Sequence, residues 1–132
     1  MRGKIYTLEE LGKALPLVRS IVSDMVSLFE RLSKELDRER VDGTEELTDR
    51  DLLRLLSWEA RDLVDEVRAC VDELSELGIY LRDPHTGLVE AYGEREGENV
   101  YYSWKPGEDR VQYWHGLFGS PRERRPVRHA LA

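Results

Sequence analysis

Apolar side chains recur every three or four positions along the first part of the 132-residue chain, and this spacing constrains the fold more than any other feature. The positions that share it are Leu8, Leu11, Leu15, Val18, Val22, Met25, Phe29, Leu32 and Leu36. Steps that alternate between three and four residues place all of them on one side of an α-helix. We therefore expect a long helix whose apolar side needs a partner.

The residues around Thr7 form a helix-start signal. Thr7 can cap the helix, and Glu10, three residues later, can complete a capping box. Tyr6 precedes the cap and can pack onto Leu11. Pro16 interrupts the pattern, because an interior proline loses a backbone hydrogen bond and crowds the preceding turn. Either a kink near Pro16 or two helices, the second beginning at Pro16, is expected.

A second segment repeats this spacing after the charged, aperiodic stretch DRERVDGTEEL. Thr48 and Asp51 resemble another cap, and Gly78 stands where helices commonly end. The apolar positions are Leu53, Leu56, Ala60, Leu63, Val67, Cys70, Leu74 and Leu77. Residues 7–77 therefore predict an antiparallel helical hairpin with a coiled-coil-like seam, each arm about 45 Å long.

The periodicity changes after Gly78. The segments GIYLRD, GLVEAY, NVYYSW and RVQYWH are short, rich in branched and aromatic residues, and separated by turn-forming stretches. They predict a four-stranded antiparallel β-meander over residues 78–115, followed by a basic C-terminal tail over residues 116–132. The expected fold is a single α+β domain over residues 1–132, with the hairpin packed on the meander.

The Pro-Gly turn after the third predicted strand sets which side chains share a face of the sheet. If Trp104 lies opposite Asp109, alternation predicts one face made of Val100, Tyr102, Trp104, Val111 and Tyr113, with His115 at its edge. The other face then carries Tyr101, Ser103, Gln112 and Trp114. A loop one residue longer or shorter reverses this pairing of faces.

Charge and hydropathy restrict the kinds of partner that the chain can bind. The net charge is −7, and residues 1–77 carry 12 Lys and Arg against 19 Asp and Glu, whereas residues 78–132 carry 8 of each. An acidic helical part repels phosphate backbones, so a nucleic-acid partner is not expected. Because no apolar run approaches the ~18 residues of a membrane span and the start lacks an apolar signal region, we expect a cytoplasmic protein without a membrane partner.

No cofactor or metal site is expected. His85, His115 and His129 all lie outside the predicted helices, where a di-iron bundle would need them. Cys70 is the single cysteine, so it forms no internal disulfide, and its place on the helical seam predicts a buried, inert thiol. The sequence has no phosphate-binding glycine loop, nucleophile elbow or zinc pair.

The segment VYYSWKPGEDRVQYWHG concentrates six aromatic rings, counting His115, around the Pro-Gly turn. One interpretation is a core, since rings at alternate strand positions bury the most area. The other is a ligand site, because rings beside an imidazole and a guanidinium suit a planar or anionic ligand. The candidate site residues are Glu90, Trp104, Glu108, Tyr113, Trp114, His115 and Arg124. In the structural alternative, His115 merely ends a strand and Arg124 pairs with Glu90 or Glu108.

Segments along most of the chain resemble a known family. YTLEE, LPLVR, ELGIYLRD, TGLVEAY, VYYSWKPGE, VQYWHG and RRPV, between Tyr6 and Val127, are similar to a prokaryotic family called domain of unknown function two-two-zero-three. The resemblance implies no established activity. The family pattern is carried here by Glu90, by Trp104, Gly107 and Glu108, by Tyr113, Trp114 and His115, and by Arg124 with Pro126.

This chain departs from that family pattern at three places. Ser103 stands where the pattern has cysteine, Gly116 stands where it has an acid after histidine, and SPRE replaces a glycine-aromatic loop. A catalytic site that used the second acid would be lost in this protein.

Two hypotheses on function follow. The first is a non-enzymatic regulatory or scaffolding module that forms a homodimer through its helices, because apolar residues remain outside the two seams. The proposed contact residues are Ile21, Leu28, Leu55 and Trp58, with Trp58 as the anchor. The alternative is a small-ligand-binding or hydrolytic domain with its site around Trp114, His115 and Arg124.

Overall fold

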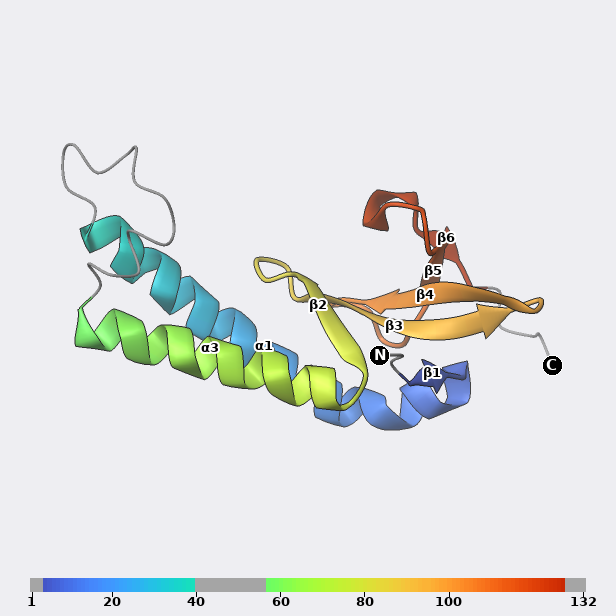
Figure 1. Ribbon diagram of the computed structural model, residues 1–132, viewed down its shortest axis with the longest axis horizontal. Coiled ribbons are helices and arrows are strands. Elements are labelled where there is room, and N and C mark those ends of the chain that lie inside the picture. The colour runs from blue at the N-terminus through green and yellow to red at the C-terminus, as the bar shows by residue number, and fades with distance from the viewer. Residues whose placement is uncertain (1–3, 40–56, 128–132) are drawn as a thin grey trace.

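The computed structural model describes residues 4–39 and 57–127 (Figure 1). Within them two helices and six short strands confirm the α+β class. In chain order these are β1 (Ile5–Tyr6), α1 (Leu8–Glu39), α3 (Trp58–Glu76), β2 (Ile79–Asp83), β3 (Leu88–Arg95), β4 (Glu98–Trp104), β5 (Tyr113–Gly116) and β6 (Arg125–Pro126). A single 3-10 turn, η1 (Pro121–Glu123), lies between β5 and β6.

The predicted capping box starts α1. The Thr7 amide donates to Glu10 Oε1 at 2.9 Å, and the Glu10 amide donates to Thr7 Oγ1 at 3.1 Å. The helix then continues through Pro16 to Glu39 as one element, so the two-helix alternative is wrong. Leu15 and Val18, on either side of the exposed proline, are buried in the core, and this packing offsets the backbone bond that Pro16 removes. A kink at Pro16 stays a prediction.

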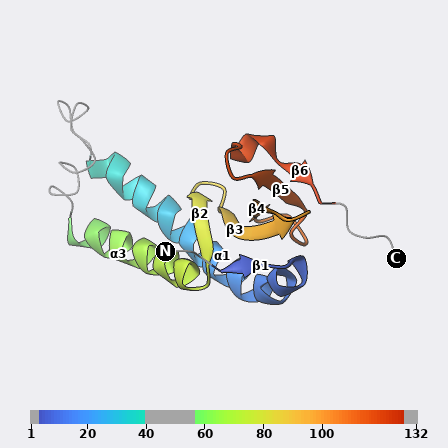
Figure 2. The same ribbon diagram turned by 45° about the vertical axis from the view of Figure 1, so that its right-hand side comes forward.

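The two helices lie side by side and run in opposite directions (Figures 1 and 2). α3 begins after Ser57, whose Oγ accepts from the Ala60 amide at 3.2 Å, and it ends before Gly78, which adopts a φ of +79°. Glycine reaches this left-handed conformation without steric cost, as a helix end requires. The predicted cap at Thr48 and Asp51 lies outside the described residues.

The sheet contains the predicted meander and two further strands. The strand order is β1-β3-β4-β5-β6, with β2 also paired to β3. β1 runs parallel to β3, and β6 runs antiparallel to β5. The prediction of four strands is therefore wrong, because β1 and β6 have two residues each and so carry no alternation that a sequence pattern could reveal.

The register between β4 and β5 also corrects the prediction. Tyr102 pairs with Trp114 and Ser103 pairs with Tyr113, whereas Trp104 has no partner in β5. The loop is longer than the predicted turn, since β5 begins only at Tyr113. Trp114 therefore shares a face with Tyr102, and Tyr113 lies on the opposite face. The predicted grouping on β4 is right, and the grouping on β5 is reversed, as a loop of different length requires.

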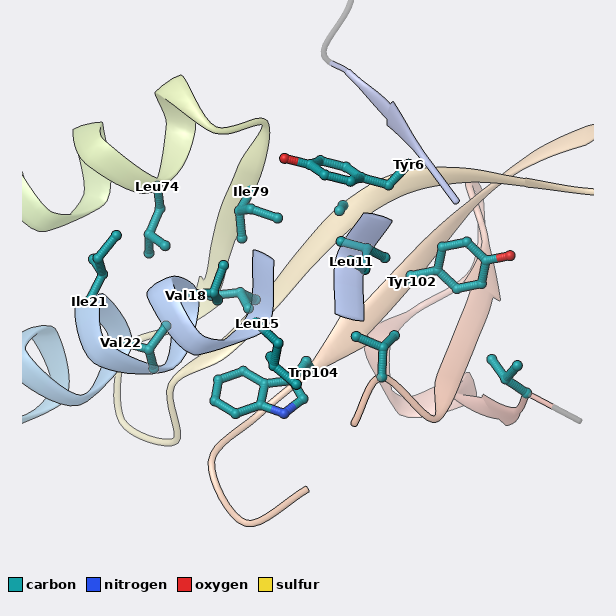
Figure 3. Packing of buried hydrophobic residues seen from close by; sticks show 14 of the residues in the cluster. Tyr6, Leu11, Leu15, Val18, Ile21, Val22, Leu74, Ile79, Tyr102 and Trp104 are labelled. Atoms are coloured by element: carbon teal, nitrogen blue, oxygen red, sulfur yellow. The ribbon is translucent and has the colours of Figure 1, made fainter. Parts of the chain in front are cut away.

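One face of the sheet, the helix-covered face, packs on the first half of α1 (Figure 3). Its buried strand residues are Ile79, Val89, Ala91, Val100, Tyr102 and Trp104. They meet Leu11, Leu15 and Val18 of the helix in the same hydrophobic cluster. Gly93 is required beneath Tyr102, because a Cβ there would lie 2.1 Å from the Tyr102 ring. The core interpretation of Tyr102 and Trp104 is confirmed.

The predicted dimer surface is only partly on the outside. Ile21 is 5% exposed within the core, so its assignment to an interface is wrong. α1 packs against α3 and the sheet at once, and this requires a wider apolar stripe than a two-helix seam. Leu28 is half-buried against the small cluster of Leu32, Ala60 and Leu63. Trp58 is 80% exposed, and Leu55 lies outside the described residues.

Candidate functional site

The outer face of the sheet, opposite α1, holds a buried pair of a carboxyl and an imidazole side chain. Glu90 of β3 and His115 of β5 are each 2% exposed. Arg82 Nε donates to Glu90 Oε1 at 2.6 Å, and Glu90 Oε2 contacts His115 Nε2. His115 Nδ1 lies 2.8 Å from the Gly116 carbonyl oxygen and must donate to it, because a carbonyl only accepts. Both nitrogens of the imidazole are therefore engaged within the protein.

Aromatic rings line this pair. The Tyr101 ring lies 5.3 Å from that of His115 and 4.9 Å from that of Tyr92, measured between centroids. The Tyr101 hydroxyl donates to the Tyr92 hydroxyl at 3.3 Å, and this bond, with burial, raises the pKa of Tyr101. The Arg82 guanidinium lies 5.2 Å from the Tyr101 centroid. The rings thus shield the Glu90 carboxylate from water, and Arg82 lies beside the Tyr101 ring.

Arg124, from the segment after η1, is held in a similar way. Its Nε donates to Ser103 Oγ at 2.8 Å, and its Nη2 donates to Glu108 Oε1 at 2.8 Å. The guanidinium stacks 4.2 Å from the Tyr113 ring centroid. Glu108 is itself fixed, since its carboxylate also accepts from the Lys105 amide at 3.1 Å. The pair of Arg124 with Glu108 that the structural alternative predicted is present.

The two arginines border a cleft of about 330 Å³, within the range of small-ligand sites. Its lining residues are Arg82, Asp83, Thr86, Leu88, Lys105, Ser120, Arg122 and Arg124. We call this the basic cleft, because four cationic side chains and one carboxylate line it. The His85 amide donates to Asp83 Oδ1 at 2.9 Å and holds the pKa of that carboxyl below its usual value, so Asp83 is charged at neutral pH.

A second cleft differs from the basic cleft in the sign of its net charge. At the far end of the helices, a cleft of about 470 Å³ is lined by Arg31, Lys34, Glu35, Arg38, Glu59, Asp62, Leu63 and Glu66. Three cationic side chains there face four carboxylates. The side chains that line the basic cleft carry a formal excess of three positive charges, and Glu90 and Glu108, which pair with Arg82 and Arg124, reduce it to one. The helix-end cleft carries an excess of one negative charge.

The predicted site residues separate onto the two faces. Glu90, Glu108, Tyr113, His115 and Arg124 gather on the outer side, next to the basic cleft or behind it. The two tryptophans do not join them. Trp104 is 2% exposed on the helix-covered face, and its indole donates to the Glu108 carbonyl at 2.9 Å. Trp114 packs against the hydrophobic core, with Arg95 and Arg125 over its ring at 5.1 and 5.6 Å.

The predicted set of site residues omits three of the four cationic side chains that line the cleft: Arg82, Lys105 and Arg122. The position of Arg82 could have been predicted from strand alternation. Arg82 is two residues after Tyr80 on β2, so the two share a face, and Tyr80 pairs directly with Glu90. Alternation therefore places Arg82 and Glu90 on one face of neighbouring strands. Lys105 and Arg122 lie outside the strands, so the pattern carried no information on their position.

The described residues hold neither a metal cluster nor a membrane span. Across residues 4–39 and 57–127, no group of three or more His, Cys, Asp or Glu side chains could hold a metal ion. Among the described helices, neither is long and apolar enough to cross a membrane.

Comparison with known proteins places the chain in a family without a known activity. No curated protein and no solved structure matches it. The family described as an uncharacterized conserved protein, DUF2203, matches residues 4–127. This range covers both helices, the whole sheet and every lining residue of the basic cleft. The protein belongs to the uncharacterised DUF2203 family.

Proposed function

We propose that the protein is a binding module for a small anionic ligand, which occupies the basic cleft. The observation that carries this proposal is the convergence of Arg82, Lys105, Arg122 and Arg124 on one cleft. The whole chain has a net charge of −7, so a local excess of positive charge is not a consequence of composition. Clustered cations that face a small cavity repel one another and are favoured by an anion between them.

The manner in which the arginines are held supports binding. Arg82 and Arg124 each use Nε for a partner within the protein, Glu90 and Ser103 respectively. Within the described residues, neither Nη1 group has a hydrogen-bond partner in the protein, so donors remain for a ligand. Burial opposes the charge of Arg82, but the hydrogen bond to Glu90 and the negative charge of that carboxylate together outweigh burial, and the pKa of the guanidinium is raised. Arg82 and Arg124 are therefore fixed before a ligand arrives, which lowers the entropic cost of binding.

The geometry favours binding over hydrolysis. A general base needs a nitrogen or oxygen within hydrogen-bond reach of the substrate. Both nitrogens of His115 are occupied by Glu90 and Gly116, and the imidazole is 2% exposed. We therefore assign His115 to positioning Glu90, which in turn positions Arg82.

Isothermal titration calorimetry at fixed ionic strength tests the proposal. The ligands are inorganic phosphate, acetate and succinate, and the variant is Arg122→Ala, whose exposed side chain makes no hydrogen bond or ion pair within the described residues. We expect at least one anion to bind the wild type in the millimolar range and to bind Arg122→Ala several-fold more weakly, since each charge-assisted contact contributes about tenfold.

Arg68→Ala is the matched control, because Arg68 is an exposed arginine of α3 and does not line the cleft. It removes the same charge from the chain and should leave the affinity unchanged. Equal losses in Arg68→Ala and Arg122→Ala, or no binding of any anion by the wild type, would contradict the proposal.

A homodimer is a second candidate, and the exposure of Trp58 supports it. This indole is 80% exposed at the start of α3, with the Arg61 guanidinium 5.6 Å from its ring centroid. Large exposed aromatic side chains commonly anchor protein contacts. Analytical ultracentrifugation at tens of micromolar should show a wild-type dimer that Trp58→Ala weakens. A monomeric wild type would remove this candidate.

A further inference from the structure

We infer that the anionic group of the ligand is a tetrahedral dianion of the phosphate-monoester class, and not a carboxylate. This inference rests on the proposed function, since it specifies what the basic cleft binds. The feature of the cleft that carries it is the set of directions from which the cationic side chains reach the cleft.

The cations belong to three separate segments. Arg82 comes from β2, Lys105 from the loop after β4, and Arg122 and Arg124 from η1 and the residue that follows it. A carboxylate has two oxygens in one plane and is satisfied by a single guanidinium fork. A phosphate has three terminal oxygens in a pyramid and can accept from donors in several directions. The cleft has donors in that second arrangement.

A single phosphoryl group is a better fit than a polynucleotide. The cleft has a volume of about 330 Å³, which accommodates a small molecule. Outside it, residues 1–77 carry 19 acidic side chains against 12 basic ones, and this surplus repels an extended phosphate backbone.

The ranking of four probes tests the ligand class. The affinities of the full chain for inorganic phosphate, sulfate, acetate and succinate are measured by calorimetry at pH 7.5 and fixed ionic strength. Phosphate and sulfate should each bind about tenfold more tightly than acetate, and also more tightly than succinate. If acetate or succinate binds as tightly as phosphate, the inference is wrong and anion binding itself survives. If no probe binds, the proposed function fails as well.

A variant tests the three-segment arrangement. Lys105→Gln removes one direction of approach at an exposed side chain that makes no hydrogen bond or ion pair within the described residues. We expect a loss of about tenfold in phosphate affinity and a smaller loss for acetate, which one arginine fork can satisfy. Equal losses for the two anions would overturn the geometric argument. Arg68→Ala should change neither affinity.

A pH series separates the charge on the ligand from its shape. Glycerol phosphate gains its second charge near pH 6, whereas sulfate stays doubly charged. The ratio of their association constants should rise several-fold between about pH 5 and 7.5. The ionisable groups that border the cleft or its arginines affect both ligands alike: Asp83, His85, Glu90, Lys105, Glu108 and His115. A constant ratio would show that the second charge is not recognised.

Discussion

The two faces of the sheet use the same strands for opposite purposes. On the helix-covered face, Val89 and Trp104 are buried among apolar residues of α1. On the outer face, the buried side chains are Glu90, Ser103 and His115, and each has a polar partner. Successive residues of a strand point to opposite sides, so a single segment such as β3 contributes to both. Stability and charge placement are therefore encoded in alternate residues.

The difference between the two faces shows how cationic side chains are held together in an acidic protein. Buried polar groups are costly unless they are paired, and here the buried acceptors pair with the guanidinium groups that border the cleft. Glu90 holds Arg82, and Ser103 with Glu108 holds Arg124. The helix-covered face has no equivalent network among the described residues, and it stabilises the fold by apolar burial.

The largest expected effect is on the helix-covered face. Trp104→Ala should lower the free energy of unfolding by roughly 3–5 kcal/mol, because it leaves a cavity and removes the indole bond to the Glu108 carbonyl. Urea denaturation measures this change. Trp114→Ala is the matched variant and should cost clearly less, since that ring is only half-buried. Equal costs would show that the deeper burial of Trp104 does not determine the loss of stability.

A smaller loss is expected on the outer face. Glu90→Gln should lower the free energy of unfolding by about 1–3 kcal/mol, because Arg82 and His115 lose the charge of their shared partner. It should also weaken anion binding, since Arg82 is no longer fixed. Glu94→Gln, an exposed change on the same strand, should stay within about 0.5 kcal/mol of the wild type. A neutral Glu90→Gln would remove the positioning role.

Asp83→Asn should raise the affinity of the basic cleft for anions. The change removes its carboxylate, and the affinity for phosphate should rise about two- to fivefold, as expected for one nearby charge at high dielectric. Calorimetry measures this. Because the folded pKa of Asp83 is lowered, its ionisation stabilises the fold above the unfolded pKa, and this is lost as the pH falls. Acid below about pH 4 should therefore destabilise the wild type more than the variant.

The smallest expected effect is on the rate at which the Cys70 thiol is alkylated. Burial, and then the negative charges of Asp24, Glu73 and Glu66, raises the pKa of the thiol. Alkylation under native conditions should therefore be slow, and faster once the chain is unfolded in urea. Mass spectrometry follows the label. Rapid and complete modification of the folded protein would show that the helix pair is open at that position.

Much of the fold could be predicted because it is local. The capping box at Thr7 and the seam of α1 depend on residues within a few positions of one another, and both are confirmed. The face of β5 could not be predicted, since it depends on the length of the loop before Tyr113, and alternation carries no record of that length. β1 was missed because its pairing with β3 joins positions far apart in the sequence.

The candidate site was predicted in part for the same reason. Glu90, Glu108 and Arg124 were identified from the family pattern, and the structure places them on the outer side. Trp114 was grouped with His115 because the two are adjacent in sequence, but adjacent residues of a strand face opposite sides. Lys105 and Arg122 reach the cleft only through tertiary folding.

Backbone amide chemical-shift mapping during a phosphate titration tests the central claim most directly. The account predicts that the largest perturbations fall near the basic cleft, in residues 82–88, 103–108 and 120–124, and that α3 changes little. Arg122→Ala should reduce these perturbations, and Arg68→Ala should not. Perturbations concentrated at the helix-end cleft, around Arg31 and Arg38, would contradict the account and move the anion site to the helices.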